Sequence, residues 1–225
     1  WDVLPKFAVL SPWGEMHKER IIIGPTCVAE GAQWLATAEP RFAKALKVSG
    51  ELPLRRRPDG FAQLLSAIVS QQISVAAANA IWGRLRDARL TGPHKIKWAS
   101  DKTLHAAGLS RQKIRYARAL ADARINYTAL RDAPSDVVVA TLTEVPGIGV
   151  WTAEIYAMFS LGRADVFAPG DLALQEASRL LFELPDRPSE RVLRKMAEGW
   201  SPWRAVAARL LWAFYKTVKQ RDGTR

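Results

Sequence analysis

The chain has 225 residues, of which 48% are hydrophobic and 24% are charged. This composition is typical of a globular protein and excludes a chain that is disordered over most of its length. Its 33 lysines and arginines outnumber its 22 aspartates and glutamates, and the net charge of +11 favours a polyanionic partner, nucleic acid before an acidic membrane surface. A basic protein without such a partner is the alternative.

Residues 1–25 show no helical pattern. They contain two prolines and a Gly-Pro pair at 24–25, and the short run Ile21-Ile22-Ile23 gives weak evidence for a strand. We expect an irregular leader here. The stretch "LPLRRRPDG" at 52–60 interrupts the pattern again and is interpreted as a linker between two lobes.

Helical periodicity dominates the rest of the chain. The clearest stripe has the spacing i, i+3, i+4, i+7, i+8 and consists of Phe61, Leu64, Leu65, Ile68 and Val69. A second stripe, over 114–125, begins behind Ser110, a candidate N-cap. Further helices are expected over about 27–38, 40–47, 75–90, 101–107, 135–144, 149–161, 171–183, 188–200 and 203–219. Turns are expected at Gly92-Pro93, Ala133-Pro134 and Pro185-Asp186.

The residue types that usually bind metals are scarce. A single cysteine, Cys27, excludes an internal disulfide and a cysteine-ligated zinc or iron–sulfur site. The three histidines have no metal-ligand spacing, and no Ser-His-Asp set can be recognised. No apolar run approaches the ~18 residues of a membrane span. We therefore expect an intracellular protein without a membrane segment, in the cytoplasm or nucleoid if the source is bacterial.

The segment "LTEVPGIGVWTAEIYAMF" at 142–159 sets two glycines between two helical patterns. Pro146 ends the first helix, and Gly147 and Gly149 permit positive φ and remove Cβ atoms that would keep a partner away. The next helix, starting near Val150, presents free N–H groups and the positive end of its dipole, which suits a phosphate. An αα-turn in which the glycines only close a tight connection is the alternative.

Four segments together resemble a known family. They are "FAQLLSAIVSQQISVAAANAIWGRL" (61–85), "VPGIGVWTAEI" (145–155), "DVFAPGDLALQ" (165–175) and "PWRAVAARLLW" (202–212). In this order they resemble the helix-hairpin-helix (HhH-GPD) DNA glycosylases, in particular the DNA-3-methyladenine glycosylase II branch, over about residues 26–219. The resemblance implies an all-α fold of two lobes with the active-site cleft between them. One lobe would be 59–170, and the other 26–58 plus 171–225, with 1–25 as the leader.

The resemblance assigns catalysis to Asp171, which follows Pro169-Gly170 and precedes an apolar helix. Cleavage of an N-glycosidic bond leaves positive charge on the sugar, and a fixed carboxylate can stabilise that charge or orient the attacking water. An N-cap is the alternative role for this aspartate, and the two roles are compatible. Relatives that also cut the DNA backbone carry a lysine where this chain has Trp151, so the resemblance implies a glycosylase without lyase activity.

The base pocket is assigned by the same resemblance to Trp151, Trp212, Ile155 and Leu172. The last two replace tyrosines of some relatives, which implies a more apolar pocket. N-alkylated purines such as 3-methyladenine and 7-methylguanine are cationic, so the electron-rich face of a tryptophan attracts them. The remaining tryptophans are assigned by default to cores and lobe interfaces: Trp34, Trp82, Trp98, Trp200 and Trp203.

DNA contacts are expected at two turns. Gln72, with Gln71 and Ile73 beside it, would fill the gap left by a flipped nucleotide, although relatives often carry a leucine there; a polar interhelical turn is the alternative. The hairpin Gly147, Ile148, Gly149 and Val150 would hold the backbone. Carbonyls of Thr143, Val145 and Ile148 would hold a Na⁺ or K⁺ ion by resemblance alone.

The expected protein is thus a monomer that excises N-alkylated purines from damaged double-stranded DNA and leaves an abasic site. It would need no cofactor and no iron–sulfur cluster. Arginines 55–57 and Lys113 are interpreted as solvated surface charges. Two alternatives stay open: a non-catalytic helix-hairpin-helix DNA-binding module, and a glycosylase for oxidised, deaminated or mispaired bases.

Overall fold

The computed structural model describes residues 19–222; residues 1–18, most of the expected leader, lie outside the described range. Within that range the chain forms thirteen α-helices and no strand, which confirms the expected all-α fold. The helices are α1 Pro25–Ala38, α2 Pro40–Ser49, α3 Phe61–Ser70, α4 Val75–Asp87, α5 Pro93–Trp98, α6 Asp101–Ala106, α7 Arg111–Asp122, α8 Tyr127–Asp132, α9 Ser135–Thr143, α10 Val150–Tyr156, α11 Leu172–Leu181, α12 Glu190–Met196 and α13 Arg204–Asp222.

Two short helices, α5 and α8, were not predicted. The pair Gly92-Pro93 was predicted as a turn, but Gly92 is the N-cap of α5 and Pro93 its first residue. Proline is favoured at that position because the N–H it lacks would have no intrahelical partner. Helix α8 starts behind Asn126, whose side chain accepts the Ala129 N–H at 3.1 Å. Six residues give only a weak periodic signal, which sufficed to predict α6 but not α5 or α8.

Two of the predicted helices change character before they end. Helix α10 stops at Tyr156, and a π-helical segment, Ala157–Leu161, continues it. Helix α12 stops at Met196 and continues as a 3₁₀ segment, Ala197–Trp200. The strand considered for residues 21–23 is reduced to one antiparallel bridge between Ile21 and Arg163. Single π-helical turns occur frequently at functional sites.

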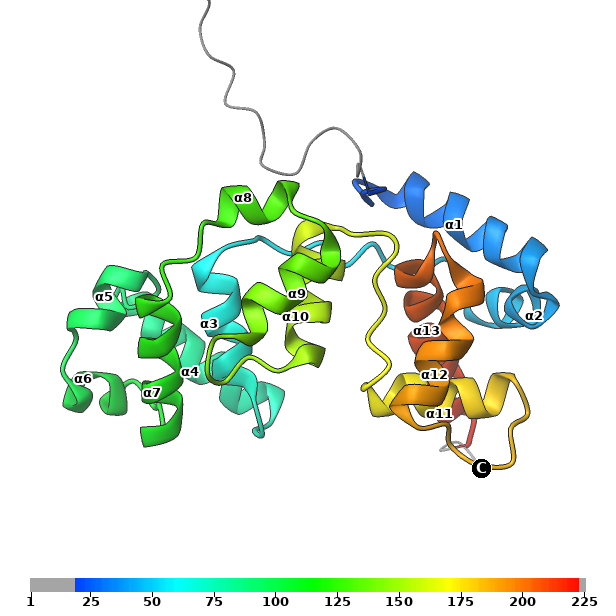
Figure 1. The fold of residues 1–225 in the computed structure, drawn as a ribbon. Helices are drawn as coiled ribbons and strands as arrows, with labels where there is room; N and C mark the ends of the chain where they lie inside the picture. The colour runs from blue at the N-terminus through cyan, green and yellow to red at the C-terminus, as the bar shows by residue number, and fades with distance from the viewer. Residues whose placement is uncertain (1–18, 223–225) are drawn as a thin grey trace, which may run out of the picture.

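The helices form two groups (Figure 1). One group holds α3 to α10, where α7 packs against α3 and α5, and α10 packs against α9. The other holds α1, α2, α11, α12 and α13, where α13 packs against α1, α2 and α11. The beginning and the end of the described chain therefore belong to the same group. Residues 50–60 and 162–171 connect the two groups.

The group around α13 is held by close apolar packing. Residues 205–208 and Leu210 of α13 are fully buried. Gly31 lets α1 approach the start of α13, because a Cβ on Gly31 would lie 2.7 Å from the ring of Trp203, the residue before α13. Trp200 and Trp203 are buried, as predicted, but Trp98 is 71% exposed and Trp34 is 37% exposed, and neither belongs to the core.

A buried arginine fixes the first connecting segment. Arg209 is fully buried in α13 and donates to the Leu54 carbonyl at 3.1 and 3.2 Å and to the Ala205 carbonyl at 2.7 Å. Burial, with Arg55 and Arg56 nearby, lowers the pKa of Arg209 to about 10. Because an unsatisfied buried cation is costly, the hydrogen bonds from Arg209 to the Leu54 carbonyl hold residues 50–60 against α13.

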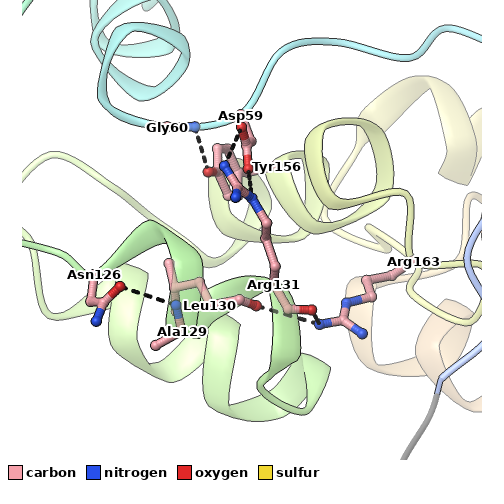
Figure 2. Close-up of polar contacts among 8 residues, drawn as sticks. All are labelled: Asp59, Gly60, Asn126, Ala129, Leu130, Arg131, Tyr156 and Arg163. Carbon is pink, nitrogen blue, oxygen red and sulfur yellow. Dashed lines mark hydrogen bonds and ion pairs between the residues drawn. The ribbon is translucent and has the colours of Figure 1, made fainter. Parts of the chain in front are cut away.

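A second buried arginine fixes α8 (Figure 2). Arg163 donates to the carbonyls of Leu130, Arg131 and Ala133, at 3.4, 2.8 and 2.6 Å, at the C-terminal end of α8. The cation there complements the negative end of the helix dipole. Arg131 in turn binds Asp59 at 2.6 Å, so α8 is tied to both connecting segments.

Candidate active site

The hairpin between α9 and α10 uses its two glycines differently. Gly147 has φ +94°, and a Cβ on it would lie 2.4 Å from Cγ of Tyr116. Gly149 has φ −86° and is the extended N-cap of α10, so it does not use the positive φ that a glycine permits; an N-cap residue takes a non-helical, extended conformation. A Cβ on Gly149 would meet no atom within 4 Å. Gly147 is therefore needed by the fold, whereas Gly149 lies beside open space.

The residues that follow the two glycines also differ, one being buried and the other exposed. Ile148 is 3% exposed and anchors the turn in the core, and Val150 is 46% exposed. Because α10 begins at Val150 and its N-cap is a glycine without a side-chain acceptor, the N–H groups of its first turn have no intrahelical partner. The hairpin thus offers backbone donors at an open surface, which is the geometry of an anion seat.

The turn between α3 and α4 lies against this hairpin. The side-chain amide of Gln71 donates to the Gly147 carbonyl at 2.8 Å. Gln72 has φ +57°, a left-handed conformation that is uncommon outside glycine, and its side chain is exposed. Ile73 is 38% exposed. Gln71 therefore connects the two predicted DNA-contact turns. Gln72 and Ile73 are the exposed residues of the turn between α3 and α4.

Lys113 borders the groove between the two turns, and its surroundings differ from the predicted solvated surface charge. Its ammonium group donates to the Val69 carbonyl near the C-terminal end of α3, at 2.6 Å. Partial burial lowers the pKa of Lys113. The groove measures about 530 Å³ and is also lined by Gln72, Tyr116 and Gly149. The lysine thus supports the end of α3 from which the Gln71–Ile73 turn leaves.

Asp171 lies at the start of α11 and caps it. Its Oδ1 accepts the Ala173 and Leu174 N–H groups at 2.9 and 3.0 Å. The indole N–H of Trp212 donates to the same oxygen at 3.2 Å, and that of Trp151 donates to Oδ2 at 3.2 Å. Four donors therefore fix the direction of the carboxylate, and Oδ2 is the oxygen with the fewest.

The structure brings the two predicted pocket tryptophans together on one carboxylate. Trp151 comes from α10 and is 46% exposed, and Trp212 comes from α13 and packs against Phe159 with ring centres 5.8 Å apart. The guanidinium of Arg55 lies 5.9 Å from the Trp212 ring centre. Asp171 thus lies where the two groups of helices meet.

A cavity of about 300 Å³ opens beside Trp151. Trp151 and Ile155 line it from α10, but Leu172 is 62% exposed and is not among the lining residues; Trp212 does not line it either. The cavity volume is at the lower end of the range for small-molecule sites, about 300–1,000 Å³. Of the four residues predicted for the base pocket, two line the cavity and a third, Trp212, joins them through Asp171.

Most of the other lining residues were missed by sequence reasoning, among them Arg57, Gln63 and Ser160. Arg57 belongs to the triplet that was interpreted as solvated charge, and it is exposed while it also lines the cavity. Gln63 lies on α3 beside the apolar stripe, a position that periodicity treats as surface. Ser160 lies in the π-helical segment, and no sequence pattern predicted that the α-helix would change to a π-helix there.

The turn carbonyls predicted to hold a monovalent cation fit that function in their chemistry. Thr143, Val145 and Ile148 lie within six residues of one turn. The Val145 carbonyl already accepts the Ile148 N–H at 3.0 Å, and a carbonyl oxygen has a second lone pair for an ion. Between residues 19 and 222 no group of three or more His, Cys, Asp or Glu side chains could hold a metal.

None of the helices that the structure describes combines the length and apolar character needed to cross a membrane.

Comparison with known proteins agrees with this geometry. A family model described as "HhH-GPD superfamily base excision DNA repair protein" matches residues 65–202. DNA-3-methyladenine glycosylase 1 of Schizosaccharomyces pombe is 29% identical over 221 residues, which cover 93% of this chain and 94% of the relative. Residues 65–202, which the family model matches, contain both turns, Asp171 and Trp151.

Two solved structures are also similar. A DNA-3-methyladenine glycosidase from Bacillus halodurans superimposes with a TM-score of 0.77 at 32% identity, over 91% of this chain and 95% of that one. The 3-methyladenine DNA glycosylase of S. pombe, solved in complex with abasic DNA, has a TM-score of 0.70 at 28% identity, over 84% and 97% of the two chains. The chain belongs to the HhH-GPD superfamily of base excision DNA repair proteins.

Proposed function

We propose that this chain is a DNA glycosylase that removes N-alkylated purines, of the 3-methyladenine and 7-methylguanine type, from duplex DNA by hydrolysis of the N-glycosidic bond. The observation that carries the proposal is the carboxylate of Asp171, held by two backbone N–H groups and by the indoles of Trp151 and Trp212. A helix cap alone does not require two tryptophans. The glycosylase names of the similar proteins support the same function.

Binding would begin at the two turns. Gly149 lies beside open space and Val150 is exposed, so the N–H groups of the first turn of α10 suit a DNA phosphate, and the surplus of positive charge adds a sequence-independent attraction. A base inside a duplex cannot reach a recessed carboxylate, so the nucleotide must be flipped out. Gln72 and Ile73 project beside the hairpin and would fill the gap in the stack.

The flipped base would enter the cavity beside Trp151. N-alkylation at N3 or N7 makes the purine cationic, and the face of a tryptophan attracts a cation by about 0.5–2 kcal/mol. A cationic purine is also a better leaving group, and it is less firmly stacked and paired. Selectivity for alkylated bases would therefore combine a modest preference in binding with the lability of the lesion.

Asp171 would act on the sugar. As the bond to the base breaks, positive charge develops at C1′, and the negative charge of the carboxylate stabilises it. Because Oδ1 accepts three hydrogen bonds and Oδ2 one, Oδ2 is the oxygen that is free to face the sugar or the attacking water. Water then completes the hydrolysis and leaves an abasic site.

The reaction would stop there. Trp151 occupies the position where lyase members of the family carry a lysine, and an indole cannot form a Schiff base with the sugar. The product is intact backbone with an abasic site. No cofactor takes part in this chemistry. A Na⁺ or K⁺ ion at the carbonyls of Thr143, Val145 and Ile148 would only bridge the hairpin to a phosphate, and the protein would act as a monomer.

The test is release of bases from methylated duplex DNA by the wild type and by Asp171→Asn. Asparagine is as good an N-cap as aspartate, so the variant should unfold at nearly the same denaturant concentration. Loss of the charge should lower the rate at least about 10²–10³-fold, the effect of removing one electrostatic stabiliser of a transition state.

Ser100→Ala is the matched control, because it removes the cap of α6, an acceptor for the Thr103 N–H at 3.1 Å that lies away from the cavity. It should lose about 1 kcal/mol of stability and keep its activity. No released 3-methyladenine or 7-methylguanine from the wild type would refute the proposed function. Full activity of Asp171→Asn would refute the role of the carboxylate, and backbone nicking would refute the absence of lyase activity.

A further inference from the structure

The cavity beside Trp151 has one apolar side and one polar side. Trp151, Ile155 and Leu64 are part of the apolar side. Among residues 19–222, five polar groups that line the cavity make no hydrogen bond through their side chains: the guanidinium of Arg57, the amide of Gln63 and the hydroxyls of Ser66, Thr152 and Ser160. A pocket that only had to stack a base would not need them.

Ser160 is the most informative of the five, because only its polar atom is fully buried. It is 4% exposed, and its hydroxyl oxygen is buried without a hydrogen-bond partner. A buried hydroxyl without a partner is destabilising, so native structures contain few of them. Rotation about one side-chain bond turns the hydroxyl of a serine that lines a cavity toward its contents. A bound base can supply the partner that the protein lacks.

Arg57 is held next to this serine. Its backbone N–H donates to the carbonyl of Phe159, the residue before Ser160, at 3.0 Å. Its guanidinium lies 5.7 Å from the Phe159 ring centre. The same connecting segment is fixed a second time by the Gly60 N–H, which donates to the Tyr156 hydroxyl at 2.8 Å (Figure 2).

Gln63 completes the polar side from the first turn of α3. Its backbone N–H donates to the Gly60 carbonyl at 3.2 Å, so its helix starts at the residue that Tyr156 holds. The backbone that carries the polar side is therefore fixed before a base arrives. Fixed backbone reduces the ordering that binding would otherwise require.

We propose that Arg57, Gln63 and Ser160 form a hydrogen-bonding edge that favours purines with a carbonyl acceptor, such as 7-methylguanine, over amino-purines such as 3-methyladenine. This inference rests on the proposed function and assigns a preference to its site. A guanidinium can only donate, whereas a hydroxyl and an amide can do both. Guanine presents the O6 acceptor where adenine presents the N6 amino donor, so an arginine matches the first and opposes the second.

The preference is best measured as a ratio of two release rates from one substrate. Both lesions are cationic, so the attraction of Trp151 and the repulsion of Arg57 act on both and cancel in the ratio. We would treat duplex DNA with a methylating agent and follow the release of 7-methylguanine and 3-methyladenine by chromatography under single-turnover conditions. The proteins are the wild type, Arg57→Met, Ser160→Ala and two controls.

The controls are matched to the two variants. Ser178→Ala removes another fully buried hydroxyl without a partner, in α11 and away from the cavity. Arg191→Met removes one positive charge from an exposed position on α12 that does not line the cavity. Thermal unfolding of all five proteins checks that the folds are intact.

Arg57→Met should lower the ratio of 7-methylguanine to 3-methyladenine about tenfold or more, because the guanidinium can only donate. Ser160→Ala should lower the release of both bases about three- to tenfold, because its hydroxyl can donate to one base and accept from the other. Both controls should keep the wild-type ratio and rates. An unchanged ratio in Arg57→Met, or unchanged release rates in Ser160→Ala, with both bases released by the wild type, overturns the hydrogen-bonding edge and leaves the proposed function in place. Release of neither base by the wild type refutes the proposed function and the edge together.

Discussion

The two glycines of the hairpin should respond to alanine in opposite ways. Gly147 has φ +94°, and a left-handed conformation costs a residue with a Cβ about 1–2 kcal/mol. The added Cβ would also lie 2.4 Å from Cγ of Tyr116, near the stem of that side chain, so the ring must move. Overpacking of this kind costs about 1–3 kcal/mol. Gly147→Ala should therefore lose about 2–5 kcal/mol, a large part of a total stability of about 5–15 kcal/mol.

Gly149→Ala is the counterpart at the same turn. Its φ of −86° suits alanine, and the new methyl would meet no atom within 4 Å. Stability should change by less than about 1 kcal/mol, because alanine is only a poorer N-cap than glycine. The methyl would stand where a phosphate approaches the hairpin, so DNA affinity should fall about tenfold, as expected for the loss of one hydrogen bond to a charged group.

Urea unfolding and fluorescence anisotropy on an abasic duplex measure the two effects separately. Gly147→Ala should shift the unfolding midpoint without changing the slope of the transition, and Gly149→Ala should shift only the binding curve. Equal destabilisation by both substitutions would contradict the assignment of Gly147 to the fold. Wild-type DNA affinity in Gly149→Ala would contradict the assignment of Gly149 to the DNA contact.

Three further predictions concern the carboxylate, the pH dependence and the core. Trp151→Phe removes the indole donor to Oδ2 of Asp171, so the single-turnover rate should fall about tenfold or more, and an unchanged rate would contradict that contact. Burial raises the pKa of Asp165, but the hydrogen bonds and charge of Arg204 outweigh it and hold this pKa below its usual 3.8. The ionised carboxylate therefore stabilises the fold fully above pH 3.8. The wild type should be more stable than Asp165→Asn by about 2 kcal/mol at pH 7, and this difference should shrink as the pH falls through the lowered pKa of Asp165. A constant difference in urea titrations at several pH values would contradict this ion pair. Gly31→Ala should lower Tm although alanine is the better helix former by about 1 kcal/mol, because its Cβ would lie 2.7 Å from a tryptophan ring; a raised Tm would show that the ring yields easily.

Features that depend on neighbours in the chain could be predicted from the sequence. The stripe on residues 61–69 predicted α3 because an amphipathic helix repeats its apolar face within a few residues. Ser110 was predicted as an N-cap, and its hydroxyl accepts the Lys113 N–H at 3.3 Å. The order of the family's motifs carried the assignment to the glycosylases, and family membership is now shown.

Features that depend on distant parts of the chain could not be predicted. The contact between Gln71 and Gly147 joins residues 76 apart, so no local pattern indicates it. The π-helical segment could not be predicted either, because its residues would suit an ordinary α-helix.

Asp171 shows the difference between what the sequence and what the tertiary structure determine. The sequence by itself determined that this residue starts a helix behind Pro169-Gly170 and that it matches the family's carboxylate, because capping and motif identity are local properties. Only the tertiary structure decided that Trp151, from 20 residues before, and Trp212, from 41 residues after, both donate to it. Such contacts exist only once the two groups of helices pack together, because packing and not chain order sets the distance between their side chains.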